Sequence, residues 1–119
     1  MDVFTALDID FKKLNLISEW QAWAKDTEGQ YIDCNDVQAE FYKLARQDLV
    51  GRTDLDVSVL NNHDAINCRN NDQMVITNNQ TIWFTEPATI NNKLDHYLSI
   101  KAPLYNQDKK IMGTFGLCY

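Results

Sequence analysis

The chain has 119 residues, of which 45% are hydrophobic, and it contains only four glycines and two prolines. This length and composition predict a single packed domain rather than a disordered segment. The formal net charge of −6 argues against nucleic acid or an anionic membrane as a direct partner, because both attract basic surfaces.

The cysteines and the distribution of apolar residues exclude further classes. Cys34, Cys68 and Cys118 are widely spaced and odd in number, which predicts neither a zinc site nor a disulfide framework. No segment approaches the roughly 18 apolar residues of a membrane-spanning helix, and the N-terminus lacks the pattern of a signal peptide. We therefore expect a cytoplasmic protein that does not associate with a membrane.

The first segment, residues 1–17, is predicted to form an amphipathic helix. Its apolar residues are spaced by three or four positions, which places them on one side of a helix. This side is wide enough to pack on a sheet face or on a second chain. The candidate dimer interface consists of Phe4, Leu7, Phe11 and Leu14.

A β-hairpin and a helix are expected next. Two short strands within residues 18–34 flank a polar turn that ends at Gly29, where a positive φ is needed. A helix is then predicted over residues 37–46, with Asn35 or Asp36 as its cap.

The middle of the chain is predicted to be helical. Gly51 is expected to stop the preceding helix, and residues 55–60 are expected to form a helical turn. Residues 62–77 are predicted to form a second main helix. Its expected core-facing residues are Ile66, Met74, Val75 and Ile76.

Three runs of β-favouring residues complete the chain, at 81–90, 96–105 and 110–119. Polar turns at 91–95 and 106–109 separate them and predict antiparallel neighbours. Together with the hairpin, this order predicts an α+β fold in which helices cover one face of a five-stranded antiparallel sheet.

The turn length sets an expected pairing between the first two of these strands. A five-residue turn at 91–95 places three pairs opposite each other: Glu86–Lys101, Ala88–Ser99 and Ile90–Tyr97. If Glu86 and Lys101 point inward, they can recognise a polar or charged ligand. If they point outward, they form a weak surface ion pair. A structural pair is favoured over a ligand-recognising one.

Several stretches, in the expected order, resemble a PAS domain. Residues 23–35 are similar to the opening hairpin of that family, and DLVGRTDLD at 48–56 resembles the elbow of one PAS subgroup. Glu86-Pro87 resembles the acidic-proline step of the same subgroup. KAPL at 101–104 and IMGTFG at 111–116 resemble its ending.

The resemblance covers residues 18–119 and leaves residues 1–17 as a flanking segment. It implies a curved five-stranded sheet whose inner face forms a pocket with the helices. It also implies a sensory or dimerisation role that is coupled to a separate output domain. The turn at Asp108-Lys109 departs from the family, which usually has a glycine in this turn.

Neither a cofactor nor a metal is expected. Asn67-Cys68-Arg69 is similar to the reactive motif of flavin photosensors in the same superfamily, but the position that matches their cysteine is Asp54, which cannot form a thiol adduct. His63 opens the long helix, whereas haem-binding members take their axial histidine from deeper in that helix. Neither His63 nor His96 has a partner at metal-binding spacing.

The strands and covering helices supply a candidate ligand pocket. Aromatic residues on the strands predict an apolar floor with a few polar atoms, although core packing explains each of them singly. The candidate lining residues are Tyr42, Ile66, Met74, Trp83, Glu86, Tyr97, Ser99, Lys101 and Phe115.

No set of nucleophile, base and orienting group can be assembled from the sequence. We therefore predict a non-catalytic PAS sensory module for signal transduction. It would bind a small molecule or form a homodimer, and regulate a kinase, a cyclase or a DNA-binding transcription regulator. The alternative is a ligand-free interaction domain. A weaker third reading is a small α+β enzyme with Asp54 or Glu86 as its acid.

Overall fold

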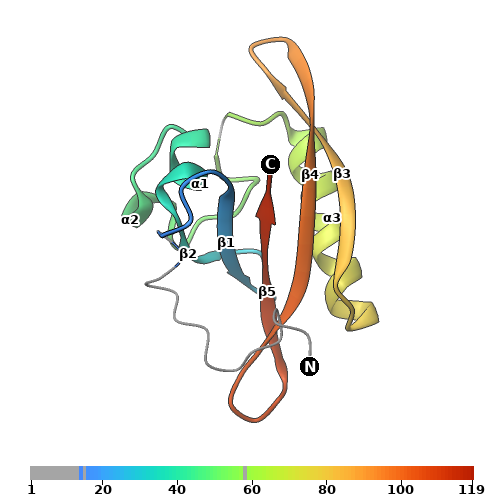
Figure 1. Cartoon of the computed structure of the whole chain (residues 1–119). Helices are drawn as coiled ribbons and strands as arrows, with labels where there is room; N and C mark the ends of the chain where they lie inside the picture. The colour runs from blue at the N-terminus through green and yellow to red at the C-terminus, as the bar shows by residue number, and fades with distance from the viewer. Residues whose placement is uncertain (1–13, 15, 58) are drawn as a thin grey trace.

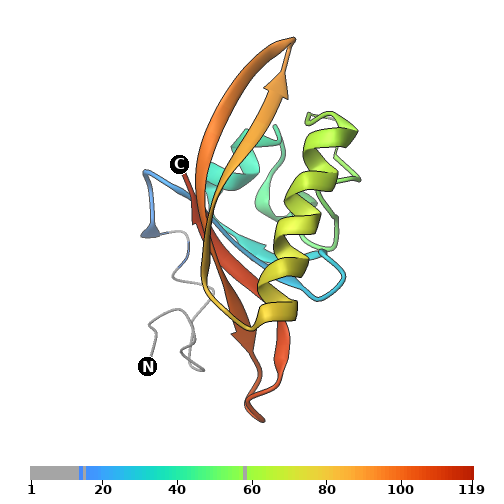
Figure 2. The ribbon, with the colours of Figure 1, turned by 90° about the vertical axis from the view of Figure 1, so that its right-hand side faces the viewer.

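The computed structural model describes residue 14 and residues 16–57 and 59–119. Five antiparallel strands form one sheet in the order β2-β1-β5-β4-β3. The helices lie on one face of this sheet, and α3 runs along it (Figures 1 and 2). The predicted α+β fold class, with five strands and helices on one face, is confirmed.

The elements follow the predicted order with shifted boundaries. The strands are β1 (Gln21–Asp26), β2 (Tyr31–Cys34), β3 (Ile82–Ile90), β4 (Lys93–Tyr105) and β5 (Ile111–Cys118). The helices are α1 (Asp36–Phe41), α2 (Arg46–Leu49) and α3 (Asn62–Asn78). None of the described helices is long and apolar enough to cross a membrane.

The opening hairpin forms as expected around a turn that Asp26 and Gly29 fix. The Asp26 carboxylate accepts hydrogen bonds from the backbone N–H groups of Glu28 and Gln30, both at 2.9 Å. Gly29 has a φ of +83°, which glycine adopts without steric cost. This turn leads Trp23 and Lys25 of β1 and Tyr31 of β2 toward the helices.

Asn35 is the N-cap of α1, and its side chain also bonds to strand β1 of the hairpin. Its Oδ1 accepts from the backbone N–H groups of Gln38 and Ala22, both at 3.0 Å. The predicted helix over 37–46 is too long, because Lys43 takes a φ of +58° and ends α1 early. A short α2 follows after this break.

The predicted helical turn at 55–60 is wrong, since the described residues there form bends and turns. The loop is nevertheless held in place. Gly51, with a φ of +87°, donates to the carbonyl of Tyr31 at 2.8 Å, and Tyr31 donates to the carbonyl of Arg52 at 2.8 Å. These bonds bring Asp54 beneath the sheet.

Helix α3 agrees with the predicted range, but two of its expected core residues face outward. Ile66 is 47% exposed and Met74 is 46% exposed, whereas Val75 is buried. The buried positions of α3 include Asp64, Ala65 and Asp72. The sheet presents lysines to this helix, so the helix turns carboxylates toward them and leaves apolar side chains outside.

The pairing of β3 with β4 differs from the predicted one. Glu86 lies opposite Tyr97 and Ile82 opposite Lys101, because the turn contains only Asn91 and Asn92. Both asparagines have positive φ, as a two-residue hairpin turn of this hand requires. The pairs Ala88–Ser99 and Ile90–Tyr97 are therefore also wrong. The displacement is an even number of residues, so every side chain keeps its predicted face.

Two apolar clusters lie on the two faces of the sheet. The inner cluster includes Trp23, Tyr31, Tyr42, Leu49 and Leu60. The outer cluster consists of Ala24, Ala102, Leu104 and Phe115, with Ile32 and Met112 packed against it. Of the predicted N-terminal interface, Phe4, Leu7 and Phe11 lie outside the described residues, and Leu14 is half-buried.

Candidate ligand-binding site

A cavity of about 50 Å³ lies between the inner face of the sheet and the helices. It has room for about four water-sized atoms, since one water needs about 10–15 Å³ measured in this way. Its lining comes from all five strands, α1, α3 and the loop that carries Asp54. The lining residues are Gln21, Trp23, Lys25, Tyr31, Gln38, Phe41, Tyr42, Asp54, Leu60, Cys68, Glu86, Pro87, Ala88, Tyr97, Ser99, Lys101 and Cys118.

Lys25 is the first of two buried lysines at this site. Its Nζ lies 2.6 Å from Asp54 Oδ2 and 2.9 Å from Asp72 Oδ2. The same nitrogen lies 4.6 Å from the ring centroid of Trp23 and 5.0 Å from that of Tyr31. Burial alone would lower the pKa of Lys25, but the two carboxylates outweigh burial and raise it. The ammonium form is therefore stable in the core.

Asp54 gathers the hydroxyl groups of two tyrosines around a single carboxylate oxygen. Tyr31 donates to its Oδ1 at 2.5 Å, and Tyr42 donates to the same oxygen at 2.6 Å. Burial would raise the pKa of Asp54, but Lys25 and the two hydroxyl groups lower it. Burial, together with the Asp54 charge, raises the pKa of both tyrosines. Asp54 thus remains an anion and the tyrosines remain neutral donors.

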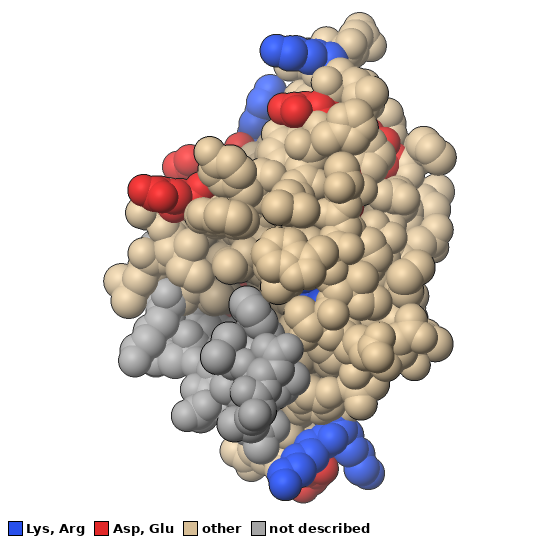
Figure 3. All heavy atoms as spheres, turned by 45° about the vertical axis from the view of Figure 1, so that its right-hand side comes forward, with Lys and Arg blue, Asp and Glu red and all other residues tan. Residues whose placement is uncertain are grey.

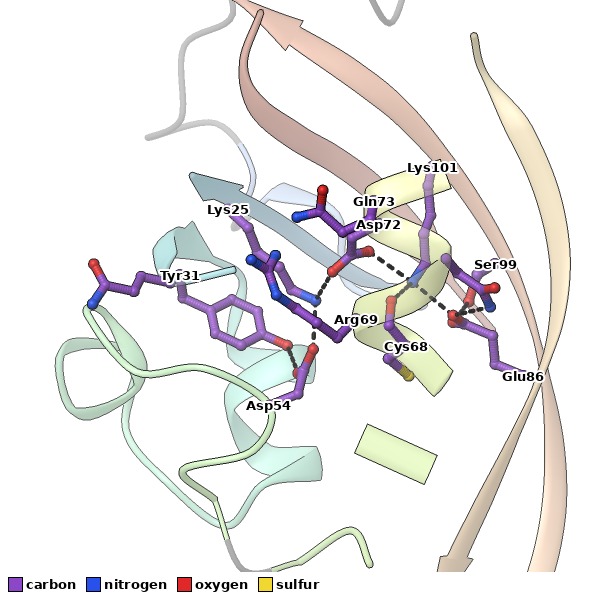
Figure 4. A network of polar contacts seen from close by, with 12 residues as sticks. Lys25, Tyr31, Asp54, Cys68, Arg69, Asp72, Gln73, Glu86, Ser99 and Lys101 are labelled. Carbon is purple, nitrogen blue, oxygen red and sulfur yellow. Dashed lines mark hydrogen bonds and ion pairs between the residues drawn. The ribbon is translucent and has the colours of Figure 1, made fainter. Parts of the chain in front are cut away.

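Lys101 is the second buried lysine, and it shares Asp72 with the first (Figure 4). Its Nζ lies 2.9 Å from Asp72 Oδ1, 2.6 Å from Glu86 Oε2 and 3.3 Å from the carbonyl of Cys68. Asp72 and Glu86 raise the pKa of Lys101 against the opposing effect of burial.

Glu86 is held in place from three sides. Ser99 donates to its Oε1 at 2.6 Å, and Asn71 donates to its Oε2 at 3.0 Å, beside the ion pair with Lys101. Burial opposes the ionised form, but Lys101 and these donors lower the pKa of Glu86. The predicted Glu86–Lys101 pair is therefore present, inside the fold and diagonal across the strands rather than directly opposite.

These contacts form one chain of alternating charges: Asp54, Lys25, Asp72, Lys101 and Glu86. Every member is at most 6% exposed. The chain joins β1, β3, β4, α3 and the 50–60 loop, so a molecule in the cavity touches groups that hold most of the domain together. Its carboxylates are acceptors and its ammonium groups are donors of fixed position, which suits recognition of polar ligands.

The two thiols at the cavity are not activated. Burial, with Glu86 nearby, raises the pKa of Cys68, and burial also raises the pKa of Cys118. A thiolate is the reactive form of cysteine, so both side chains act as small, weakly polar wall atoms.

Five of the nine predicted pocket residues line this cavity: Tyr42, Glu86, Tyr97, Ser99 and Lys101. The other four lie elsewhere. Ile66 and Met74 are on the outer side of α3, Trp83 is 58% exposed on the outer face of β3, and Phe115 belongs to the outer cluster.

Lys25, Tyr31 and Asp72 were not among the predicted site residues. A signal for Lys25 was present, because it lies two positions from Trp23 on a strand and so shares its face. Asp72 lies four positions after Cys68, one helical turn further along the same side of α3.

A wider groove of about 410 Å³ adjoins the cavity. Gln21, Tyr97 and Cys118 line both the groove and the cavity. The charged groups of the groove are Glu19 and Asp95. The half-buried Tyr97 lines both spaces, so the groove and the cavity meet at this side chain.

The profile of the PAS fold family matches residues 18–119, and the chain belongs to this family. No curated protein sequence matches it. The fold is similar to that of the Vibrio cholerae VqmA dimer, a LuxR-type receptor with a target DNA. That similarity has a TM-score of 0.80 at 18% identity, over 91% of this chain and 49% of VqmA.

VqmA bound to DPO is similar with a TM-score of 0.78 at 18% identity, over 92% of this chain and 57% of that one. The PAS domain of histidine kinase ThkA has a TM-score of 0.64 at 12% identity, over 83% of this chain and 97% of that one. The chain spans about half the length of the VqmA structures. At these identities the likeness shows the fold alone.

Proposed function

We propose that the chain is a non-catalytic PAS sensory module that binds a small molecule in the inner cavity and regulates an output domain. The observation that carries this proposal is the buried charge chain around an internal space. Buried ion pairs seldom stabilise a fold better than apolar side chains of the same volume. Their presence around a cavity therefore favours a recognition role.

The chemistry of the lining favours binding over catalysis. Raised pKa values keep Lys25 and Lys101 as ammonium ions, which are neither nucleophiles nor bases. Lowered pKa values make Asp54 and Glu86 weak bases. Catalysis by a small α+β enzyme with Asp54 or Glu86 as its acid is therefore disfavoured.

We also propose that no haem or flavin binds. The cavity of about 50 Å³ is far smaller than the roughly 300–1,000 Å³ of sites for larger ligands. His63 is exposed at the start of α3, away from the lining.

We propose, by analogy with the similar structures, that the output domain is a kinase, a cyclase or a DNA-binding regulator. The similar structures include a DNA-binding receptor and a kinase PAS domain. The place of Asp54 and Lys101 in the charge chain is compatible with the subgroup suggested by the elbow and the KAPL strand. Homodimerisation through Phe4, Leu7, Phe11 and Leu14 is part of the proposal. The double variant Leu7→Glu/Phe11→Glu should therefore be a monomer, as measured by light scattering.

A ligand-free interaction domain is the second candidate. The small cavity volume favours it, and so do the exposed apolar residues of the outer sheet face: Trp83, Leu94 and Leu98. In that case the charge chain would only fix the packing of α3.

One experiment separates the two candidates. Native mass spectrometry and absorbance spectra of the purified protein detect a retained compound. Melting temperatures measured with added cell extracts or compound sets detect a compound that stabilises the protein. Ala88→Leu places a leucine side chain in the cavity, whereas Thr85→Leu places one on the exposed outer face of β3. We expect a compound that stabilises the wild type and Thr85→Leu but not Ala88→Leu. Absence of any stabilising compound would leave the interaction domain.

A further inference from the structure

The charge chain carries an unbalanced charge. Its carboxylates are Asp54, Asp72 and Glu86, and its ammonium groups are Lys25 and Lys101. When all five side chains are ionised, this buried charge chain has a net charge of −1. Asp72 reaches both lysines from α3 without lining the cavity, so the lysines are neutralised from behind as well as by Asp54 and Glu86.

The hydrogen-bonding capacity of the wall is unbalanced in the same sense. Lys101 has three partners for its three N–H groups. Lys25 has two carboxylate partners, and its nitrogen also faces two aromatic rings. Asp54 and Glu86 each accept three bonds of the about four that a carboxylate can accept. A ligand with N–H donors thus finds free acceptor positions on both carboxylates, whereas an anion meets two lysines that carboxylates already neutralise.

Aromatic rings occupy much of the remaining wall. Trp23, Tyr31, Phe41, Tyr42 and Tyr97 all line the cavity. Phe41 lies edge-on to Tyr42 and to Tyr97, with ring centroids 5.1 and 5.5 Å apart. Ring faces attract cations and repel anions. The adjoining groove carries the carboxylates of Glu19 and Asp95, which also attract cations.

From these observations we infer that the cavity selects a small organic monocation, such as a protonated amine or amidine, over neutral and anionic compounds of the same shape. This inference rests on the proposed function, because it names the ligand class of that site. The cation would donate to the free acceptor positions of Asp54 and Glu86 and pack against the rings. Its single positive charge would balance the charge chain.

Acetamidinium, acetamide and acetate test the inference directly. They share one planar skeleton of four non-hydrogen atoms, which suits the cavity size, and they carry charges of +1, 0 and −1. Binding is measured by NMR titration of amide signals in phosphate buffer at constant ionic strength, free of amine buffers. We expect acetamidinium to bind at least about tenfold more tightly than acetate, because opposite charges interact strongly in a buried site.

Two variants tie the preference to the charge chain. Glu86→Gln keeps the shape of the side chain and removes one negative charge, so the preference for acetamidinium over acetamide should fall by about tenfold. Asp108→Asn removes an exposed charge in the β4–β5 turn and should leave it unchanged. If Glu86→Gln fails to fold, the order of the three probes on the wild type decides alone.

Equal binding of the three probes, tighter binding of acetate, or no binding by any of them would overturn the inference. The proposed function is judged separately, by retained mass and thermal shift with compounds of any charge. A neutral or anionic compound that stabilises the wild type but not Ala88→Leu would leave the sensory module standing and reject the cation.

Discussion

The two faces of the central sheet both carry apolar clusters, but only the inner face also carries buried charges. On β1, Trp23 and Lys25 point toward the helices, whereas Ala22 and Ala24 point the other way. On β4, Ser99 and Lys101 point inward, whereas Ala102 and Leu104 belong to the outer face. In most two-layer folds the helix-covered face is the apolar one, and here that face carries the charges.

The difference indicates different roles for the two faces. The outer face is held by ordinary apolar packing, and Figure 3 shows uncharged atoms across most of the surface on the side of β3 and β4. The inner face bears the cost of burying five charges, which their mutual pairing and the hydrogen bonds to Asp54 and Glu86 offset. Both faces therefore contribute apolar packing, and the inner face adds a specific arrangement of polar groups around the cavity.

The largest effect is expected from Asp72→Ala. This change removes the carboxylate that Lys25 and Lys101 share, and it leaves two buried ammonium groups with one partner fewer each. Loss of one partner from a buried pair costs about 3–5 kcal/mol. Urea unfolding followed by circular dichroism measures this loss. Asp108→Ala, in an exposed turn, should cost less than about 0.5 kcal/mol, and a similar small loss for Asp72→Ala would refute the role of the charge chain.

A smaller effect, of a different kind, is expected on the outer face. Leu104→Ala removes a side chain that is 3% exposed in the outer cluster and should cost about 2–3 kcal/mol. Leu98→Ala is the matched control, since it lies on the same strand and face but is 45% exposed. Both variants should bind the cavity ligand as the wild type does. A Leu104→Ala protein with weakened ligand affinity would show that the two faces are not independent.

Much of the fold was predictable from the sequence, because strands and turns leave local signals. The Asn and Asp turns and the β-favouring runs located all five strands. The β3–β4 turn was misjudged because Lys93, Leu94 and Asp95 are exposed at the end of a long hairpin, where no alternation with the core marks a strand. The early end of α1 depends on the left-handed Lys43, which no local rule predicts.

The site was only partly predictable, because its polarity reverses the usual rule. Apolar residues are expected to face inward, which favoured Ile66 and Met74, but α3 turns Asp72 toward the sheet and leaves both exposed. Glu86 and Lys101 were found because strand parity survived the error in register. Lys25 was missed because a single charge within a strand usually faces water, although its spacing of two positions from Trp23 places both side chains on the same face.

The smallest effect is expected from pH in the neutral range. Asp54 and Glu86 have lowered pKa values and Lys25 and Lys101 raised ones, so none of the four titrates between about pH 6 and pH 9. The free energy of unfolding should be nearly constant there. Below about pH 4.5 the carboxyl groups of the unfolded chain take up protons that the native ones refuse, and stability falls as pH falls.

Above about pH 10 the lysines and tyrosines give the opposite dependence of stability on pH. Unfolded lysines and tyrosines lose protons that native Lys25, Lys101, Tyr31 and Tyr42 retain, so stability falls as pH rises. Glu86→Gln should remove part of the acid loss, whereas Leu104→Ala should lower the whole curve without changing its shape. A difference between wild type and Glu86→Gln that does not depend on pH would mean that Glu86 is not held as an anion. The charges of the inner face would then contribute as little to the pH dependence of stability as the outer face does.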